Sequence, residues 1–304
     1  MWRVKEQIGC TDKVQQKYSG KNISVAILDT GIFLHPDLYG RVLAFHDFIH
    51  HKESPYDDCG HGTHVAGCLA GDGYLSEGRY CGIAPSSQLI VGKILDKKGS
   101  GNIDTMISAI QWILKIQEEF NIKILNISIG FEDRISDIKI KKLIDLLEDV
   151  WSRGILVVVA AGNKGPQLKS ISPLGMSKNI FTIGCHDLDY HKDGVVLCET
   201  YSGRGPSPFS LKKPDLVAPG TNIISTSYQC RREGKKFTNI YESKSGTSFA
   251  TPLVSGAAAL LLERKTNLTP DEIKFQLCYT ATDLKEPWNK QGWGMLNIKR
   301  ALEL

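Results

Sequence analysis

Short apolar segments alternate with helical segments along most of the chain, and this alternation limits the fold more than any other feature. The run 155–160 contains only Ile, Leu, Val and Ala, which is typical of a strand buried on both faces. Residues 103–119 carry apolar side chains at helical spacing. Strands separated by helices favour a parallel sheet with helices on both faces. We therefore predict an α/β fold of three layers around a doubly wound, mostly parallel sheet.

The other segments of the chain fit the same architecture. We expect further strands at 23–28, 42–49, 89–94, 124–129, 180–184 and 216–218. We expect helices in the lead-in 4–18, from His61, over 140–151, in the apolar run that follows Ser248, and from a capping box at Thr269. Proline lacks an N–H, so Pro252 should lie in the first turn of its helix. The sequence shows no repeat, linker, signal peptide or prosegment. We therefore expect residues 1–304 to form one domain, in which 1–20 is an N-terminal lead-in.

Composition excludes several classes of protein. Of 304 residues, 41% are apolar and 23% charged, which is ordinary for a soluble protein. A net charge of +4 is too small to indicate nucleic acid, and the basic clusters 139–142 and 231–236 are expected to be solvated surface. No apolar segment reaches the roughly 20 residues of a membrane span. The eight cysteines contain no CxxC pair, so we expect free thiols and a cytoplasmic location.

Four polar residues stand where an expected strand ends or an expected helix begins. Asp29 and Asn163 follow strands, whereas His61 and Ser248 stand at helix starts. Taken alone, Asp29 could cap a turn and Ser248 could cap a core helix. Together they supply what acyl transfer needs: a hydroxyl, a base that titrates near neutral pH, a carboxylate that orients the base, and an amide donor for an oxyanion.

Four sequence blocks, in this order, resemble the signature blocks of the subtilisin-like serine proteases: 29–31 (DTG), 61–67 (HGTHVAG), 160–163 (AAGN) and 246–252 (GTSFATP). The run 71–85 is most similar to the cytoplasmic AprX-type bacterial subset of that family. The resemblance spans roughly residues 20 to 300 and implies a subtilisin-like fold.

The resemblance also implies a role for each of the four polar residues. Ser248 would be the nucleophile and His61 the general base, with Asp29 orienting His61. Asn163 would donate to the oxyanion together with the Ser248 N–H. The implied activity is that of a serine endopeptidase that works through an acyl-enzyme. Its specificity would be broad, with an apolar residue before the scissile bond.

The resemblance further implies a polypeptide substrate that binds as an added, extended strand. The implied substrate-binding residues are Gly99, Ser100, Gly101, Ser128, Ile129, Gly130, Ala161 and Gly162. Ile171 would lie near the floor of the pocket, where relatives often have glycine. Neither nucleic acid nor a membrane is an expected partner, and the oligomeric state stays open.

Two features depart from the family pattern. No cofactor is required for the chemistry. Asp37 matches a calcium-ligand aspartate of many relatives, so a structural calcium ion is a further hypothesis, but the loop 72–81 differs in length and content from their calcium loop. Cys59, two residues before His61, could line the cleft or be an inert small side chain. Two competing interpretations are a zinc site built from Cys59, His61, His64 and Cys68, and an inactive binding module.

Overall fold

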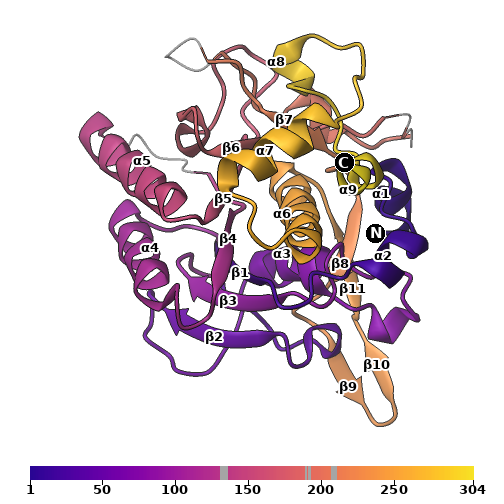
Figure 1. Ribbon diagram of the computed structural model, residues 1–304. Coiled ribbons are helices and arrows are strands. Elements are labelled where there is room, and N and C mark those ends of the chain that lie inside the picture. Colours follow the sequence, from indigo (N-terminus) through magenta and orange to yellow (C-terminus); the bar gives the residue numbers. More distant parts are fainter. Residues whose placement is uncertain (131–135, 189, 191–192, 207–210) are drawn as a thin grey trace.

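A seven-stranded sheet forms the centre of the computed structural model, which describes residues 1–130, 136–188, 190, 193–206 and 211–304 (Figure 1). Every neighbouring pair in this sheet is parallel. Its strands are β1 (Ser24–Asp29), β2 (Val42–Asp47), β3 (Gln88–Lys93), β4 (Ile122–Ile127), β5 (Leu156–Ala160), β6 (Phe181–Cys185) and β7 (Leu216–Ala218). The predicted α/β fold and the approximate places of its strands are confirmed.

The order of the strands places a switch point beside β1. The order is β2-β3-β1-β4-β5-β6-β7, so the chain builds one half of the sheet, returns, and builds the other half on the opposite side of β1. In open α/β sheets a crevice forms outside the carboxyl ends of the strands at such a point. Asp29 is the last residue of β1 and therefore lies at that crevice.

Helices cover both faces of the sheet (Figure 1). On one face α3 (His61–Ala70) packs against α6 (Thr247–Arg264), and on the other α4 (Ile103–Ile116) packs against α5 (Asp137–Ser152). The remaining helices are α1 (Trp2–Gln7), α2 (Asp12–Lys17), α7 (Pro270–Tyr279), α8 (Trp288–Gln291) and α9 (Ile298–Glu303). The 3-10 turns are η1 (Pro36–Leu38), η2 (Tyr74–Ser76), η3 (Pro173–Met176) and η4 (Cys198–Thr200). The predicted capping box at Thr269 starts α7.

Fifteen of the 18 residues of helix α6 are buried, as its apolar sequence predicts. Its start differs from the prediction in two ways. Gly246 is the N-cap residue, so Thr247 and Ser248 lie inside the first turn instead of capping it. Pro252 lies beyond the first turn, which corrects the expectation above. Without an N–H on Pro252, the helix lacks the hydrogen bond that would run back to the Ser248 carbonyl.

Two antiparallel pairs of strands lie outside the central sheet, beside α3. Strand β8 (Ile223–Thr226) pairs with β11 (Tyr241–Lys244), and the chain between them forms a hairpin of β9 (Arg231–Glu233) and β10 (Lys236–Thr238). Figure 1 shows this hairpin projecting from the lower edge of the molecule. Nothing in the sequence analysis anticipated it.

The prediction that all cysteines are free thiols is wrong for one pair. Cys185 and Cys198 form a disulfide, with their Cα atoms 5.9 Å apart, which is within the range that the bond requires. Their separation of 13 residues matches no cysteine motif, so only the fold reveals the pairing. Six cysteines remain free: Cys10, Cys59, Cys68, Cys81, Cys230 and Cys278. None of the described helices combines the length and apolar content that crossing a membrane requires.

Candidate active site

Asp29 and His61 form a close pair at the switch point of the sheet. The Nδ1 atom of His61 lies 2.7 Å from Oδ1 of Asp29, and the carboxylate is completely buried. The same oxygen accepts a hydrogen bond of 2.7 Å from the Thr30 N–H. A buried carboxylate on Nδ1 holds the proton on that nitrogen, which leaves Nε2 as the basic atom of the ring.

The environment of His61 tunes it as a base. Burial disfavours the imidazolium, but the charge of Asp29 and its hydrogen bond outweigh the burial. As a result, the pKa of His61 is raised above its ordinary value, although the positive charge of Lys244 acts in the opposite direction. The His61 side chain is 23% exposed, so a substrate can reach the ring.

Asp57, which the sequence analysis treated only as part of a loop, fixes the start of α3. One of its oxygens accepts from the Gly60 N–H at 2.8 Å, and the other accepts from the Thr63 N–H at 2.9 Å. The Thr30 hydroxyl donates to Asp57 at 2.9 Å and accepts from the Gly62 N–H at 2.9 Å. These bonds satisfy N–H groups that a helix start leaves without partners. An aspartate shortly before a helix is the signal that could have revealed this role.

Lys93 is a second residue that the sequence analysis missed. It is fully buried, and its ammonium group donates to the Thr30 carbonyl at 2.6 Å, to Asp58 at 2.7 Å and to the Leu95 carbonyl at 2.8 Å. The ammonium thereby ties the end of β1 to the loop that precedes α3. Because Asp29 and His61 stand on those two segments, Lys93 helps to set their relative positions.

Gly62 lets α3 approach the end of β1. A Cβ atom at this position would lie 2.2 Å from the Gly31 carbonyl oxygen and 3.2 Å from Oδ1 of Asp29. Any side chain would therefore push the helix away from the strand. The glycine that follows His61 is thus required for the contact between His61 and Asp29.

Ser248 lies in the first turn of α6, next to Phe249. It is the second residue of the helix and is partly exposed, whereas its neighbours Thr247 and Phe249 are buried. The His61 ring packs against the ring of Phe249, with centroids 5.2 Å apart. The fold therefore brings together three segments that are far apart in sequence and that carry the predicted carboxylate, imidazole and hydroxyl.

Asn163, three residues after the end of β5, joins the same site. Its Oδ1 accepts hydrogen bonds from the N–H and the hydroxyl of Thr247, at 3.1 and 3.0 Å. Since the carbonyl end of the amide takes both donors, its orientation is set and Nδ2 is left as a donor. The start of α6 adds a partial positive charge at this point. An anion formed next to Ser248 would be stabilised there.

A pocket of about 330 Å³ opens beside Ser248 and Asn163. Its lining includes Ile129, Gly130 and Gly162 from the predicted binding residues, together with Ile171. Ile171 is also buried.

The other predicted binding residues have different environments. Ala161 is buried, and its N–H and carbonyl are bonded to Ile183 and Ser172, so its backbone is not available to a substrate. The Ser128 hydroxyl is buried and accepts from Asn126. The loop 99–101 is exposed and lies outside the lining of the pocket.

The residues around Asp37 do not fit a calcium ion. One carboxylate oxygen of Asp37 accepts from the Leu75 N–H at 3.0 Å, and the other accepts from the Tyr241 hydroxyl at 2.7 Å. Calcium takes six to eight oxygen ligands, whereas hydrogen-bond donors point at both oxygens here. Within the described part of the chain, no group of three His, Cys, Asp or Glu side chains is placed to hold a metal ion.

The four residues of the zinc interpretation do not form a site either. His64 is buried, and its Nε2 lies 3.0 Å from the Ile223 carbonyl and 3.2 Å from the Glu242 carbonyl. Burial lowers the pKa of His64 to about 3, so the ring is a neutral structural group. Burial also raises the pKa of the Cys59 thiol, which keeps it protonated beside His61.

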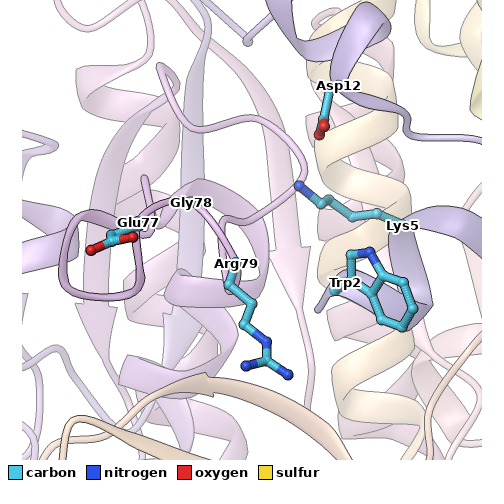
Figure 2. Close-up of a pocket in the computed structure, with 6 residues that line it drawn as sticks. All are labelled: Trp2, Lys5, Asp12, Glu77, Gly78 and Arg79. Atoms are coloured by element: carbon cyan, nitrogen blue, oxygen red, sulfur yellow. The ribbon is translucent and has the colours of Figure 1, made fainter.

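A second hollow, of about 580 Å³, lies away from these residues (Figure 2). Trp2, Lys5 and Asp12 from the N-terminal helices line one side of it, and the segment 77–79 lines the other. Two cations and two carboxylates line the hollow, so their formal charges cancel. It contains none of the predicted site residues.

Comparisons with known proteins agree with this geometry. The family model described as the subtilase family matches residues 20–294. The chain is 39% identical over 301 residues to serine protease AprX of Bacillus subtilis (strain 168), covering 94% of this chain and 67% of that protein. It is 33% identical over 283 residues to subtilisin Savinase of Lederbergia lenta, covering 93% and 91%. Among solved structures, sphericase superimposes with a TM-score of 0.77 at 28% identity, covering 93% and 96%.

Proposed function

The chain belongs to the subtilase family and is a subtilisin-type serine protease, and from this premise we propose that Asp29, His61 and Ser248 are its catalytic triad, with Asn163 as the oxyanion donor. The observation that carries the proposal is the 2.7 Å contact between His61 and Asp29. The same His61 ring packs against Phe249, the residue that follows Ser248. A carboxylate, an imidazole and a hydroxyl in that order are what peptide hydrolysis through an acyl-enzyme requires.

In the proposed mechanism, Nε2 of His61 takes the proton of the Ser248 hydroxyl as its oxygen attacks the scissile carbonyl. The negative charge moves to the carbonyl oxygen, where Nδ2 of Asn163 and the Ser248 N–H donate hydrogen bonds to it. His61 then gives its proton to the leaving amine, and the C–N bond breaks. Water, deprotonated by the same ring, releases the acyl group from Ser248. Asp29 stays ionised throughout and stabilises the imidazolium.

We propose that the substrate is a polypeptide that lies as an extended strand between 99–101 and 128–130. The pairing of β4 with β5 extends only to Ile127 and Val159, so residues 128–130 lie beyond that ladder. The pocket beside Ser248 would take the side chain before the scissile bond, and Ile171 in its lining favours apolar side chains. Main-chain hydrogen bonds would dominate binding, which fits a broad specificity.

No cofactor takes part in the proposed chemistry, because the side chains named above supply every proton transfer. A cytoplasmic location stays a prediction, and the disulfide between Cys185 and Cys198 weighs against a strongly reducing compartment.

A digestion of casein tests the proposed function directly. We expect internal cleavage that a hydroxyl-directed organophosphonate abolishes and that a metal chelator leaves unchanged. If a chelator stopped the cleavage while the organophosphonate did not, a metal-dependent mechanism would replace this one. A total lack of cleavage would favour the inactive binding module.

The activity should rise with pH through the titration of His61. Only the neutral ring can accept the proton of Ser248, and the pKa of His61 is raised by Asp29. The value of kcat/KM should therefore fall below an inflection that lies above the ordinary histidine value of about 6.5. A pH profile measured on a small ester substrate, with circular dichroism at each pH to exclude unfolding, checks this. An inflection below pH 6 would contradict the assignment of His61.

Replacing Asn163 by alanine should lower kcat by about 10²- to 10³-fold with little change in KM, a magnitude known from the oxyanion asparagine of subtilisin. The amide would act only on the charge that develops in the transition state, so substrate binding should persist. Steady-state kinetics on a peptide substrate measure both parameters. A rise in KM at constant kcat would instead assign Asn163 to substrate binding.

A further inference from the structure

The β9–β10 hairpin carries an unusual concentration of positive charge. Residues 231–236 read Arg-Arg-Glu-Gly-Lys-Lys, and all six are exposed. We call Arg231, Arg232, Lys235 and Lys236 the basic hairpin. Among the described residues, no carboxylate forms an ion pair with any of these four cations. Glu233 instead accepts from the Thr238 hydroxyl at 3.1 Å. Arg232 donates to the Gly234 carbonyl at 3.2 Å, and in the described structure the charges of the hairpin face solvent without a carboxylate partner.

The base of the hairpin packs against the start of α3, next to His61. A Cβ atom on Gly60 would lie 2.2 Å from the ring of Tyr228, so that ring rests directly on the residue before His61. The Thr226 hydroxyl donates to the Thr63 carbonyl at 2.8 Å, and the Ser227 N–H donates to the Ile240 carbonyl at 3.0 Å. These contacts fix the point from which the hairpin leaves the body.

Lys244 continues the positive charge from the hairpin toward the triad. It is the last residue of β11, four residues before Ser248, and its side chain is 23% exposed. Its ammonium lies 3.5 Å from Glu242, whose carbonyl in turn contacts His64, one helical turn beyond His61. Lys244 therefore places a cation near enough to His61 to lower its pKa, although Glu242 pairs with that cation.

This side of His61 is where the departing half of the substrate must lie. The acyl half stays on Ser248 and faces the pocket that Gly130, Gly162 and Asn163 line. His61 protonates the leaving amine, so the chain beyond the scissile bond passes His61 on the side away from that pocket. The Tyr228 ring rests on Gly60, the residue before His61, so a chain that leaves past His61 on this side is directed toward the base of the hairpin. Gly234, at the tip of the hairpin, lies seven positions after Ser227, so an extended chain over these positions spans about 23 Å.

We propose that the basic hairpin selects polypeptides with acidic side chains three to six residues after the scissile bond. The inference rests on the proposed function, because it needs the triad to define the direction of the substrate. Each exposed ion pair of this kind contributes modestly to the binding free energy, but several along one strand add up. Salt screens these interactions. Electrostatic attraction also speeds the encounter with an acidic segment.

Three fluorogenic peptides with the same acyl half test the proposal. Positions three to six after the scissile bond are all Glu, all Gln or all Lys. For the unaltered protein we expect kcat/KM to be about five- to tenfold higher for the Glu peptide than for the Gln peptide, and lowest for the Lys peptide. Salt at about 1 M, where the Debye length is about 3 Å, should remove the difference.

Two charge-matched triple variants locate the effect. In the variant Arg231→Gln, Lys235→Gln, Lys236→Gln, the ratio of kcat/KM for Glu over Gln should fall to about one or two. The control Lys139→Gln, Lys141→Gln, Lys142→Gln removes the same charge from α5, on the opposite face of the sheet, and should keep the full ratio. Both sets are exposed, so neither should unfold the protein.

Each outcome decides the matter. Equal cleavage of the three peptides would overturn the hairpin proposal and leave the proposed function standing. A preference for Glu that survives in the hairpin variant, or disappears in the α5 control, would also overturn it. Cleavage of none of the peptides, or of casein, would refute the proposed function and this inference with it.

Discussion

Replacing Ser248 by alanine is expected to lower kcat by about 10⁶-fold, the magnitude known for the same change in subtilisin. The variant loses the oxygen that forms the acyl bond. A water molecule that attacks the scissile carbonyl directly is not held in place as the Ser248 hydroxyl is. Ser248 is partly exposed and no hydrogen bond of its hydroxyl supports the described fold, so the melting temperature should hardly change. Kinetics on a sensitive peptide substrate and a thermal melt measure the two quantities.

The matched control for this variant is Ser108→Ala, which removes an exposed hydroxyl from α4 that donates only to the Asp104 carbonyl. Its activity should equal that of the unaltered protein. If the Ser248 variant cleaved casein at the normal rate, another residue would be the nucleophile and the proposed mechanism would be wrong.

Replacing Asp29 by asparagine is expected to lower kcat by about 10⁴-fold, the size seen when the triad aspartate of another serine protease is changed in this way. An amide of the same shape can hold the His61 ring in the wrong tautomer, with its proton on Nε2. The ring would then offer no basic nitrogen to Ser248. Steady-state kinetics at pH 8, with circular dichroism to confirm folding, measure the loss.

The control for Asp29 is Asp104→Asn, because Asp104 is an exposed carboxylate on α4 whose one ion pair among the described residues is with Lys139. This variant loses one negative charge without affecting any part of the site, so its kcat should be unchanged. A loss of less than tenfold in the Asp29 variant would show that orientation of His61 does not depend on the carboxylate.

The positions of the four candidate site residues could be predicted because each stands at the end of an element with a strong local signal. The β-prone run 23–28 predicts β1, and Asp29 follows it directly. The apolar sequence of α6 likewise predicts the helix that carries Ser248. Since parallel strands present their carboxyl ends at one edge, the pattern predicts Asp29 and Asn163 at one crevice. His61 and Ser248 lie near each other because the helices that carry them, α3 and α6, pack together.

Features that depend on long-range contacts were not predictable in the same way. Lys93 lies within an apolar strand, and only the fold shows that its ammonium meets the Thr30 carbonyl and Asp58. The hydrogen bonds of Asp57 and the pairing of Cys185 with Cys198 depend equally on distant segments. Local sequence carries no signal for such contacts. They form only when elements that are far apart in the sequence pack against one another.

Pro252 shows a different limit of the sequence argument. Local propensity places proline only in a first turn, yet α6 continues through it. Burial of nearly the whole helix in the core offsets the missing hydrogen bond, and tertiary packing overrides the local preference. The same packing holds the first turn of α6, which carries Ser248 and Phe249, next to α3.

Labelling by a hydroxyl-directed organophosphonate, followed by mass spectrometry of the peptide 245–264, tests most directly whether His61 activates Ser248. The account predicts a single adduct on Ser248 in the unaltered protein and almost none in His61→Ala, whose serine is intact but has no base. An adduct on a different residue, or equal labelling of Ser248 in the histidine variant, would contradict it.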